Sequence, residues 1–513
     1  MSKLYLTVTL APEFNTIPGT VTNPISEIKV WGTNKQGVYN TYANRWTYAS
    51  SNSAEITPCL SAYTAGSGKT QKATAVYECL LVPDQISSGR FGIKITVNGN
   101  EYTWSCPTEV QFESNCSYRL PVIVGKDYVT VGDVMVSDWE NGGNLPDGET
   151  TLDAWDGSIA SVLSGAGTKE DPYLISNGAE LAYVAQEINS GRTTFMGYKY
   201  FELTQNIDLA NKPWTPIGFG EPKFDADGNL EATEGKMLNA VFDGKGYTIY
   251  NLNIDESGKG VSAGFFGWYC GEIKNLTIRK ANVKSDYLAG ILIGETNGSS
   301  SINPVITNCH VSGTVSSNKG NSLGTGGMVG SSSYLTMEDC SADVEVNGSG
   351  MIGGLVGNAF ESKMVRCSVR GTVNGAWSVG GFAGILYYNS NVEECTSYVK
   401  VNASDWHCGG FVGYLEMNSV IKNCSVEGDV TSTCIVPRAG GFVGGVNDAQ
   451  MEGCSFKGKL TADKGDPKGA FIGRDGGNTK TTSCSYDATK NAGLSAIGVD
   501  DSGSTSSHDI VAK

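Results

Sequence analysis

The 513-residue chain is poor in charged residues and in histidine. Asp, Glu, Lys and Arg make up 18% of it, there are 3 histidines, and the formal net charge is −16. This negative charge, with no cluster of Lys and Arg, argues against nucleic acid or an anionic membrane as a partner. No apolar run reaches the roughly 18 residues that a membrane-spanning helix needs, so the sequence predicts no transmembrane segment.

Glycine, by contrast, is abundant, and it recurs at a fixed interval in the second half of the chain. A Gly-Gly-X-X-Gly motif, in its last copy Gly-Ala-Phe-Ile-Gly, ends at Gly330, Gly357, Gly384, Gly413, Gly444 and Gly473. Cysteines recur at the same interval, at Cys309, Cys340, Cys367, Cys395, Cys424, Cys454 and Cys484. A period of 27 to 31 residues is typical of a solenoid.

One repeat, residues 409–432, shows the expected strands. A short apolar segment around Phe411 is followed by a polar turn and a longer apolar segment from Val420 to Val430. Short strands with tight corners predict one coil of a parallel β-helix, with coils stacked about 4.8 Å apart. The pattern extends upstream to motifs that end at Gly267 and Gly294, which gives about ten coils in all.

The repeated cysteine position accepts leucine in the first repeats, at Leu252 and Leu276. Such a position requires a buried apolar group, so we interpret the cysteines as small core residues. Disulfides between coils fit the distance but not the parallel direction of the side chains, and a linear row cannot supply tetrahedral metal ligands. A partial ladder of corner asparagines that cap backbone groups is predicted just before this position, at Asn251, Asn275, Asn308 and Asn423.

Residues 177–189 have the clearest helical pattern in the chain. Leu181, Val184, Ala185 and Ile188 lie on one face, and Asn-Ser-Gly at 189–191 ends the helix. Because the segment precedes the first coils, we expect a helix that caps the N-terminal end of the solenoid, where an open edge would invite aggregation. The polar C-terminus after about Asp487 predicts a weak cap or a frayed tail.

Residues 1–143 lack the glycine repeat and alternate apolar with polar residues from Leu4 onward. Val97-Asn-Gly-Asn-Glu predicts a tight hairpin, and strands at this spacing predict an antiparallel β-sandwich. The first residues therefore indicate a strand and not a signal peptide, and we favour a mature or trimmed chain over a cytoplasmic protein. Cys59, Cys79, Cys106 and Cys116 could form up to two disulfides, and the sequence leaves open whether they do.

The predicted fold class is thus all-β. An antiparallel β-sandwich is expected over residues 1–143, a Gly-, Asp- and Ser-rich linker over 144–165, and a parallel β-helix with an N-terminal capping helix over 166–513.

Two regions resemble known families. Leu81-Val-Pro-Asp-Gln, Ile93-Lys-Ile-Thr-Val-Asn-Gly and Tyr118-Arg-Leu are similar to the C-terminal part of fimbrillin-like domains from surface proteins of gut Gram-negative bacteria. Gly165-Ala-Gly-Thr-Lys-Glu-Asp-Pro and Phe242-Asp-Gly-Lys-Gly-Tyr-Thr-Ile resemble the entry of a β-helix with GLUG-type repeats. The resemblance implies export, usually as an outer-membrane lipoprotein, and a role in adhesion or fimbria-like assembly. The sequence does not show the signal and lipobox cysteine of that family, and its sandwich is shorter than usual.

Parallel β-helices also include polysaccharide lyases and glycosidases, so catalytic groups have to be considered. A glycosidase needs two carboxylates that face one cleft, and no coil position gathers Asp or Glu from neighbouring repeats. The histidines, His310, His407 and His508, lie in separate coils or in the tail. Residues 225–231 space oxygen ligands as a calcium loop does, but their glycine is misplaced for one, and we favour a hairpin. We predict no catalytic residue, metal or cofactor.

The best candidates for a ligand site are aromatic. Trp377 and Trp406 each precede the last glycine of their motif by seven residues, so both indoles should lie on one face, about one coil apart. Tyr287 has the same place before Gly294, and nearby turns hold Tyr387, Tyr388 and Tyr414. Exposed aromatic rows bind sugar rings or partner proteins, although both indoles could instead merely cover the solenoid wall.

We therefore predict a non-enzymatic adhesin or fimbria-associated protein, located outside the cell or on its surface. Its β-helix would bind glycans or proteins of the host or of neighbouring bacteria. Other fimbrial subunits are further candidate partners, and the sandwich could join them by strand exchange at a sheet edge. The alternative is a carbohydrate-active β-helix enzyme, which a carboxylate pair on the face of Trp377 and Trp406 would favour.

Overall fold

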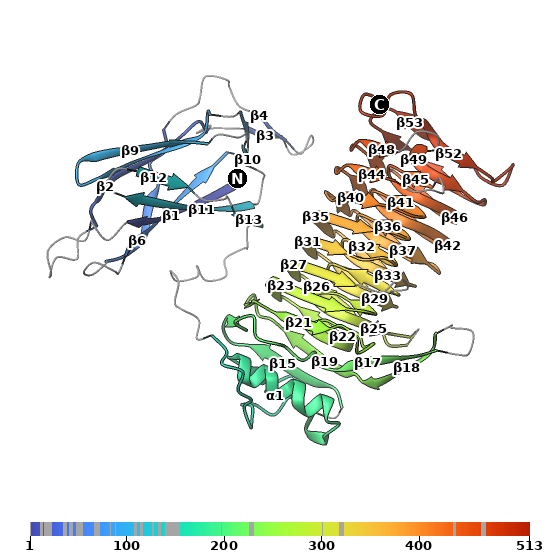
Figure 1. The fold of residues 1–513 in the computed structure, drawn as a ribbon, viewed down its shortest axis with the longest axis horizontal. Coiled ribbons are helices and arrows are strands. Elements are labelled where there is room, and N and C mark those ends of the chain that lie inside the picture. The colour runs from blue at the N-terminus through green and yellow to red at the C-terminus, as the bar shows by residue number, and fades with distance from the viewer. Residues whose placement is uncertain are drawn as a thin grey trace. The chain divides into compact units, whose positions relative to one another are not determined.

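The computed structural model divides the chain into two units, Met1–Thr150 and Thr151–Lys513 (Figure 1). The structure describes residues 2–10, 14, 23–33, 38–40, 45–47, 55–65, 72–82, 84–87, 89–106, 110–112, 116–125, 128–131, 135–138, 154–195, 197–224, 230–299, 301–317, 323–433, 438–462 and 468–513. Each unit is built from strands around its own hydrophobic core. Among these residues, no helix is both long enough and apolar enough to cross a membrane.

The first unit contains a six-stranded and a three-stranded sheet that share one core. The larger sheet has the order β12-β11-β1-β6-β5, with β13 also paired to β11. Its strands are β1 (Ser2–Leu10), β5 (Cys59–Thr64), β6 (Ala73–Leu81), β11 (Cys116–Gly125), β12 (Tyr128–Val131) and β13 (Met135–Asp138). The smaller sheet consists of β2 (Ile25–Trp31), β8 (Gly92–Val97) and β9 (Asn100–Ser105). Two short pairs are β3 (Val38–Asn40) with β4 (Arg45–Thr47) and β7 (Asp84–Ile86) with β10 (Val110–Phe112).

The alternation of the first residues places every second side chain of β1 in this core. Leu4, Leu6, Val8 and Leu10 are at most 1% exposed, which confirms the predicted strand. The hairpin at Asn98 and Gly99 is also confirmed, because β8 and β9 pair antiparallel across it. One pairing departs from the expected antiparallel pattern. β1 runs parallel to β11, since the first strand lies in the middle of the sheet, between β6 and a strand far along the chain.

Of the four cysteines of this unit, Cys59 and Cys79 have free thiols. Cys59 is exposed, Cys79 is half-buried and Cys106 is buried. Cys116 belongs to β11, but its side chain lies outside the description. No disulfide therefore joins the cysteines whose side chains the structure describes.

The second unit is a parallel β-solenoid of about 11 turns, in which successive coils stack from the green helix α1 to the red C-terminus (Figure 1). Apart from one two-stranded hairpin, its described strands form two long sheets, and every pairing between coils in these sheets is parallel. The larger sheet contains β14 (Tyr173–Ile175), β15 (Lys199–Leu203), β19 (Leu238–Asp243), β22 (Phe266–Lys274), β24 (Leu288–Ala289), β25 (Ile293–Asn297), β26 (Val305–Thr307), β28 (Gly324–Gly326), β29 (Val329–Ser333), β30 (Thr336–Glu338), β32 (Met351–Gly353), β33 (Val356–Phe360), β34 (Lys363–Val365), β36 (Ser378–Gly380), β37 (Ala383–Tyr387), β38 (Asn391–Glu393), β41 (His407–Gly409), β42 (Val412–Lys422), β45 (Ala439–Gly440), β46 (Val443–Glu452), β49 (Lys468–Asp475), β50 (Lys480–Thr482) and β52 (Ser495–Asp500). The smaller sheet contains β16 (Ile207–Asp208), β20 (Thr248–Tyr250), β21 (Asn253–Glu256), β23 (Thr277–Ser285), β27 (His310–Ser317), β31 (Ser341–Asn347), β35 (Ser368–Gly375), β39 (Thr396–Ser397), β40 (Lys400–Ala403), β43 (Ser425–Val426), β44 (Val430–Ser432), β47 (Ser455–Phe456), β48 (Leu460–Ala462), β51 (Cys484–Tyr486) and β53 (Ile510–Ala512).

Equivalent residues of successive coils stack in the solenoid core. The aromatic residue of the glycine motif forms a row of buried parallel rings, Phe382, Phe411, Phe442 and Phe471, with centroids 4.6, 5.0 and 4.8 Å apart. The seven repeated cysteines are buried and free, which confirms their interpretation as core residues. Their thiols donate to backbone carbonyls, as Cys340 Sγ does to the oxygen of Glu338 at 3.1 Å.

The corner before each cysteine requires left-handed backbone. The residue at this position has a φ between 50° and 65° in every coil from Asn275 to Ser483, a region that Gly and Asn adopt most readily. The asparagine ladder is confirmed in the first coils, where Asn308 Nδ2 donates to Asn275 Oδ1 at 3.0 Å. The bonds join side chains of successive coils, rather than capping backbone groups as expected.

The N-terminal end is capped as the sequence predicts. Helix α1 (Gly178–Asn189) buries Leu181, Val184 and Ala185, and the 3₁₀ turn η2 (Thr193–Phe195) follows it. The side chain of Asn177 accepts from the backbone N–H of Glu180 at 3.0 Å, which satisfies one free donor of the first turn. Residues 154–165, expected in the linker, lie in the second unit. Trp155 packs against Trp214 with ring centroids 5.6 Å apart, and its backbone N–H donates to the backbone carbonyl of Asp208.

The C-terminus is not the irregular cap or tail that its polar sequence indicates. Strands β52 and β53 pair with β49 and β51, so the last residues continue both sheets. The buried carboxylate of Asp475 organises this coil, because it accepts from Thr479 Oγ1 at 2.7 Å and pairs with His508 Nε2 at 3.0 Å. The periodic signal is lost here because the glycine motif and the cysteine are absent.

The expected hairpin after Trp214 is present in part. Strands β17 (Phe219–Phe224) and β18 (Leu230–Lys236) pair antiparallel. Residues 225–229, which carry most of the calcium-loop pattern, lie outside the described residues.

Candidate functional site

The two tryptophans lie side by side, as their spacing predicts. Trp377 immediately precedes β36 and Trp406 precedes β41, and these strands pair so that Ser378 stands opposite His407. The indoles are 37% and 38% exposed, with ring centroids 6.2 Å apart. Their planes meet at 74°, so the pair offers an edge and a face rather than one flat platform.

The side chains around Trp406 form a continuous stack. The ring of Trp406 lies nearly parallel to His407, with centroids 5.8 Å apart, and His407 lies on Tyr414 at 4.6 Å. The guanidinium carbon of Arg438, from the next coil, is 4.8 Å from the centroid of Trp406. Arg438 Nη1 also lies 2.9 Å from Nε2 of His407. We call the group Trp377, Trp406, His407, Tyr414 and Arg438 the tryptophan face.

Burial fixes the charge of His407. The side chain is 7% exposed, and this burial, together with the charges of Arg438 and Arg474, lowers its pKa to about 3. The imidazole is therefore neutral near pH 7, and because Arg438 has only donors, Nε2 is the acceptor of their hydrogen bond. His407 serves as an acceptor that holds Arg438 and not as a second positive charge.

A pocket of about 180 Å³ opens beside this stack. Its lining includes His407, Tyr414, Arg438, Gly445, Asn447 and Arg474, and we call it the arginine pocket. Tyr414, Gly445 and Arg474 are opposite one another on β42, β46 and β49. A Cβ at Gly445 would lie 2.6 Å from Cδ2 of His407 and 2.8 Å from Cδ2 of Tyr414, so only glycine leaves room for the two stacked rings.

The remaining predicted site residues do not join this face. Tyr287 occupies the same place on its own coil, but it is 6% exposed, and the coils of β28 and β32 separate it from Trp377. Tyr387 and Tyr388 pack on Phe360 instead, with centroids 5.3 and 4.9 Å from it, and Tyr388 is 43% exposed. The six predicted residues thus divide into one cluster around Trp406, a second around Phe360, and a buried tyrosine.

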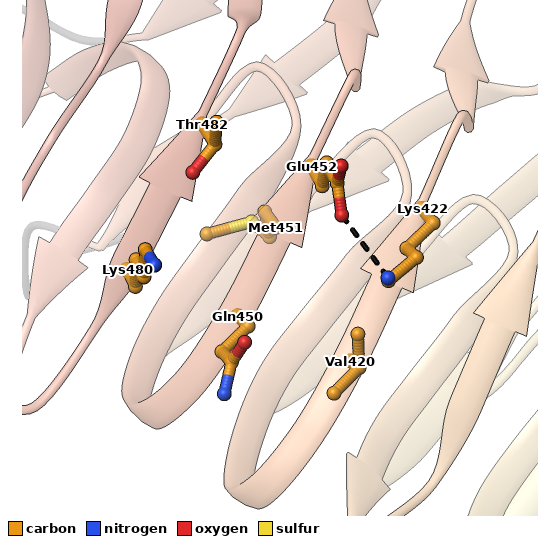
Figure 2. Close-up of a pocket in the computed structure, with 7 residues that line it drawn as sticks. All are labelled: Val420, Lys422, Gln450, Met451, Glu452, Lys480 and Thr482. Atoms are coloured by element: carbon orange, nitrogen blue, oxygen red, sulfur yellow. Dashed lines mark ion pairs between the residues drawn. The ribbon is translucent and has the colours of Figure 1, made fainter.

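A second depression, of about 190 Å³, lies on the outer surface of β42, β46 and β50 (Figure 2). Figure 2 shows Lys422 and Glu452 facing one another across adjacent strands, where Lys422 Nζ is 3.1 Å from the carboxylate. Lys480 and Gln450 line the same depression. Its one carboxylate is paired, and the lining is what parallel strands present to water, so we assign no ligand to it.

Neither pocket has the groups that glycosidase chemistry requires. The residues that line the arginine pocket include no carboxylate, and the other pocket has Glu452 alone, whereas two carboxyl groups must face one cleft. In the described part of the chain, no three His, Cys, Asp or Glu residues are grouped so that they could hold a metal ion. The carboxylate pair that would favour the enzyme alternative is not found in either pocket.

The sequence analysis missed Arg438, Gly445 and Arg474, and it treated His407 as unpromising. A signal for them exists in the motif register. His407 and Arg438 each precede the last glycine of their motif by six residues, and Tyr414, Gly445 and Arg474 each directly follow that glycine. Aligning every repeat on its final glycine, rather than only the tryptophans, would have placed these side chains in neighbouring positions.

Comparison with family models agrees with both regions of the chain. Residues 1–139 match the fimbrillin-like family, and residues 375–402 and 405–431 match the GLUG motif. The N-terminal region is fimbrillin-like, and the solenoid carries GLUG motifs. The two GLUG segments include Trp377, Trp406, His407 and Tyr414, so four residues of the tryptophan face are carried by these repeats.

Individual relatives are more distant. A segment of 178 residues, 34% of this chain, is 31% identical to Halomucin of Haloquadratum walsbyi and spans 2% of that protein. A solved structure from Bacteroides ovatus, provisionally named an immunoglobulin A1 protease, is 20% identical over 68% of this chain and 86% of its own, with a TM-score of 0.34. Two solved structures provisionally named cell adhesion proteins, from Bacteroides ovatus and Bacteroides uniformis, are 15% and 17% identical, each over 27% of this chain and over 45% and 50% of their own. Their TM-scores, 0.21 and 0.18, support no functional argument.

Proposed function

We propose that this chain is a non-enzymatic cell-surface adhesin whose solenoid binds glycans or proteins through the tryptophan face. The observation that carries the proposal is the pair of indoles, each more than one third exposed, beside an open pocket on a rigid wall. Large aromatic side chains are costly to leave in water, and they contribute strongly to binding when a sugar ring or a partner covers them. The solenoid holds them in place before a ligand binds, because both lie next to paired strands, and this lowers the entropy that binding costs.

The fimbrillin-like match of residues 1–139 supports a surface location for the protein. In this proposal the first unit attaches the solenoid to the cell surface or to other fimbrial subunits. Its first strand, β1, lies between two other strands of the sheet. Pairing of this sheet with a strand from another subunit is one route to such assembly.

The test is binding of the full chain to an array of host and bacterial glycans and to an array of surface proteins. The Trp377→Ala/Trp406→Ala variant removes both indoles. Tyr398→Ala is the matched control, because Tyr398 is also exposed (39%) and also stacks with an arginine, Arg370 at 4.2 Å, but lies between β39 and β40 of the smaller sheet. We expect the double variant to lose binding at an unchanged melting temperature, while the control binds as the unmodified chain does.

Two outcomes would contradict the proposal. Equal binding by the double variant and the unmodified chain would place the ligand elsewhere. Shortened products in a bound glycan after incubation, detected by mass spectrometry, would show a catalytic protein and favour the enzyme alternative.

A further inference from the structure

Arg438 forms no ion pair with a carboxylate among the described residues, and Asp501, which pairs with Arg474, acts on it only at longer range. Two other arginines of the solenoid are paired with carboxylates, Arg366 with Asp339 and Arg474 with Asp501, both at 2.7 Å. The side chain of Arg438 contacts Trp406 and His407, and neither is an anion. An arginine with no such ion pair is unexpected in a chain of net charge −16, where acidic side chains are plentiful.

Among the described residues, one hydrogen bond and one ring contact hold the guanidinium in place. It stacks on Trp406, and Nη1 donates to Nε2 of His407. A guanidinium has five N–H donors in a planar fork that matches a carboxylate or sulfate, and this bond uses one of them. Burial and the charge of Arg474 lower the pKa of Arg438, so an anion bound between the two arginines would relieve their repulsion.

The other charges at the arginine pocket leave it positive. Arg474 lines it and is balanced by Asp501. Glu416 lies opposite Asn447 on the neighbouring strand, and its own pKa is raised by burial. Neither Asp501 nor Glu416 lines the pocket, whereas both arginines do. Asn447 adds an amide that can donate to an anion or to a hydroxyl group.

The size of the pocket limits what it accepts. Its volume of about 180 Å³ is below the roughly 300–1,000 Å³ of sites that enclose a whole drug-sized ligand. A single terminal group fits, and the rest of a longer ligand would extend over the exposed rings of Trp406 and Trp377. An anionic group attached to a ring that stacks on an indole is the chemistry of an acidic sugar.

We infer that the arginine pocket is an anion subsite that selects glycans ending in an acidic sugar, with Arg438 as the residue that binds the carboxylate or sulfate. The inference rests on the proposed function, because it concerns the ligand of the same face. Beyond that function, it predicts that neutral glycans bind weakly. It also predicts that added salt weakens the binding of acidic glycans, because Arg438 forms a charge-assisted hydrogen bond with them.

The experiment measures binding of the full chain to four immobilised glycan sets: sialylated, uronic acid-terminated, sulfated, and the matched neutral glycans. Arg438→Gln removes the charge but keeps a donor for His407, and Arg438→Lys keeps the charge but loses the fork. Arg366→Gln is the control, because it removes the same charge from another coil. We expect Arg438→Gln to weaken binding of acidic glycans by about 10- to 100-fold, with a smaller loss for Arg438→Lys and none for the control.

The outcomes for the different variants and glycan sets test the anion subsite and the tryptophan face separately. If the unmodified chain binds neutral and acidic glycans equally and Arg438→Gln changes nothing, the anion subsite is overturned while the tryptophan face stands. If the tryptophan double variant still binds acidic glycans and only Arg438→Gln fails, the proposed platform is wrong but the subsite holds. Binding to surface proteins alone, with no glycan retained, would overturn the acidic-sugar inference. Preference among the three acidic sets identifies whether a carboxylate or a sulfate is selected.

Discussion

The rings of Phe411 and Phe442 lie parallel in neighbouring coils, with centroids 5.0 Å apart and planes that differ by 4°. The same relationship joins Phe382 to Phe411 at 4.6 Å, so the ring of Phe411 is packed between two identical rings. Both faces of the central ring are thus covered, and its side chain is fully buried. A coil stabilises its neighbours through such rows, since each coil contacts only the coils beside it.

Replacing the central ring should therefore destabilise more than one coil. We expect Phe411→Ala to lower the free energy of unfolding by about 3 to 5 kcal/mol, because it leaves a cavity between two rings. Phe411→Leu should cost less, since Leu355 occupies the equivalent place of an earlier coil with 0% exposure. Urea denaturation followed by tryptophan fluorescence measures both, and an alanine variant as stable as the leucine variant would contradict the stacking argument.

The repeated cysteines should not react with thiol reagents in the folded chain. Cys59 is exposed, whereas the solenoid cysteines are buried. Burial also raises the pKa of the Cys79 thiol to about 12, and only the thiolate reacts readily. We expect brief alkylation at pH 8, mapped by mass spectrometry, to modify Cys59 first among the cysteines described, and Cys395 only after denaturation. Fast labelling of Cys395 in the native chain would show that the coils open.

The features of the solenoid that repeat from coil to coil could be predicted from the sequence. Coil length, the core position of the cysteines and the helix before the first coil all follow from residues repeated at one interval or on one helical face. The last coil was not predicted, because it lacks the glycine motif and the cysteine and is organised by polar contacts of Asp475 with Thr479 and His508. The arginine pocket was not predicted either, since Arg438 and Arg474 come from different coils and each occurs once at its position. Periodicity reveals what repeats, whereas a binding site depends on what differs between repeats.

The corner before the cysteine offers a stabilising substitution. Glu394 adopts a φ of 55°, a left-handed conformation that is costly for a side chain other than Gly, Asn or Asp. Asn423 has the same conformation in the next coil without that cost. We expect Glu394→Asn to raise the free energy of unfolding by about 0.5 to 1 kcal/mol. Glu393→Asn, one residue earlier and in strand β38, is the control and should be neutral or slightly destabilising.

The neutral state of His407 should make stability depend on pH. Its folded pKa of about 3 lies below the ordinary value of 6.5, so the unfolded chain binds a proton that the folded chain does not. Stability from this residue is therefore complete above pH 6.5 and is lost as the pH falls toward 3. Relative to His407→Gln, the unmodified chain should lose about 2 kcal/mol between about pH 6.5 and pH 4.5. Parallel melting-temperature profiles of the two proteins would contradict this.

The tight packing of Gly445 against the rings of His407 and Tyr414 can be tested by adding one methyl group at residue 445. A Cβ at Gly445 would lie 2.6 Å from His407 and 2.8 Å from Tyr414, closer than van der Waals contact allows. Because the ring of His407 would have to move, its hydrogen bond to Arg438 would be lost. We expect Gly445→Ala to cost about 1 to 3 kcal/mol in stability and to weaken binding of acidic glycans about tenfold.

Gly476 provides the matched control, since it lines the same pocket with more space. Its added Cβ would come no closer than 3.3 Å to any atom, the Oδ1 of Asn447. We therefore expect Gly476→Ala to keep the stability of the unmodified chain and to retain glycan binding. If both alanine variants lose binding equally while remaining folded, the pocket is sensitive to any added volume and not to the position of Arg438. If Gly445→Ala alone loses it, the stack of Tyr414 and His407 sets the orientation of the arginine that meets the ligand.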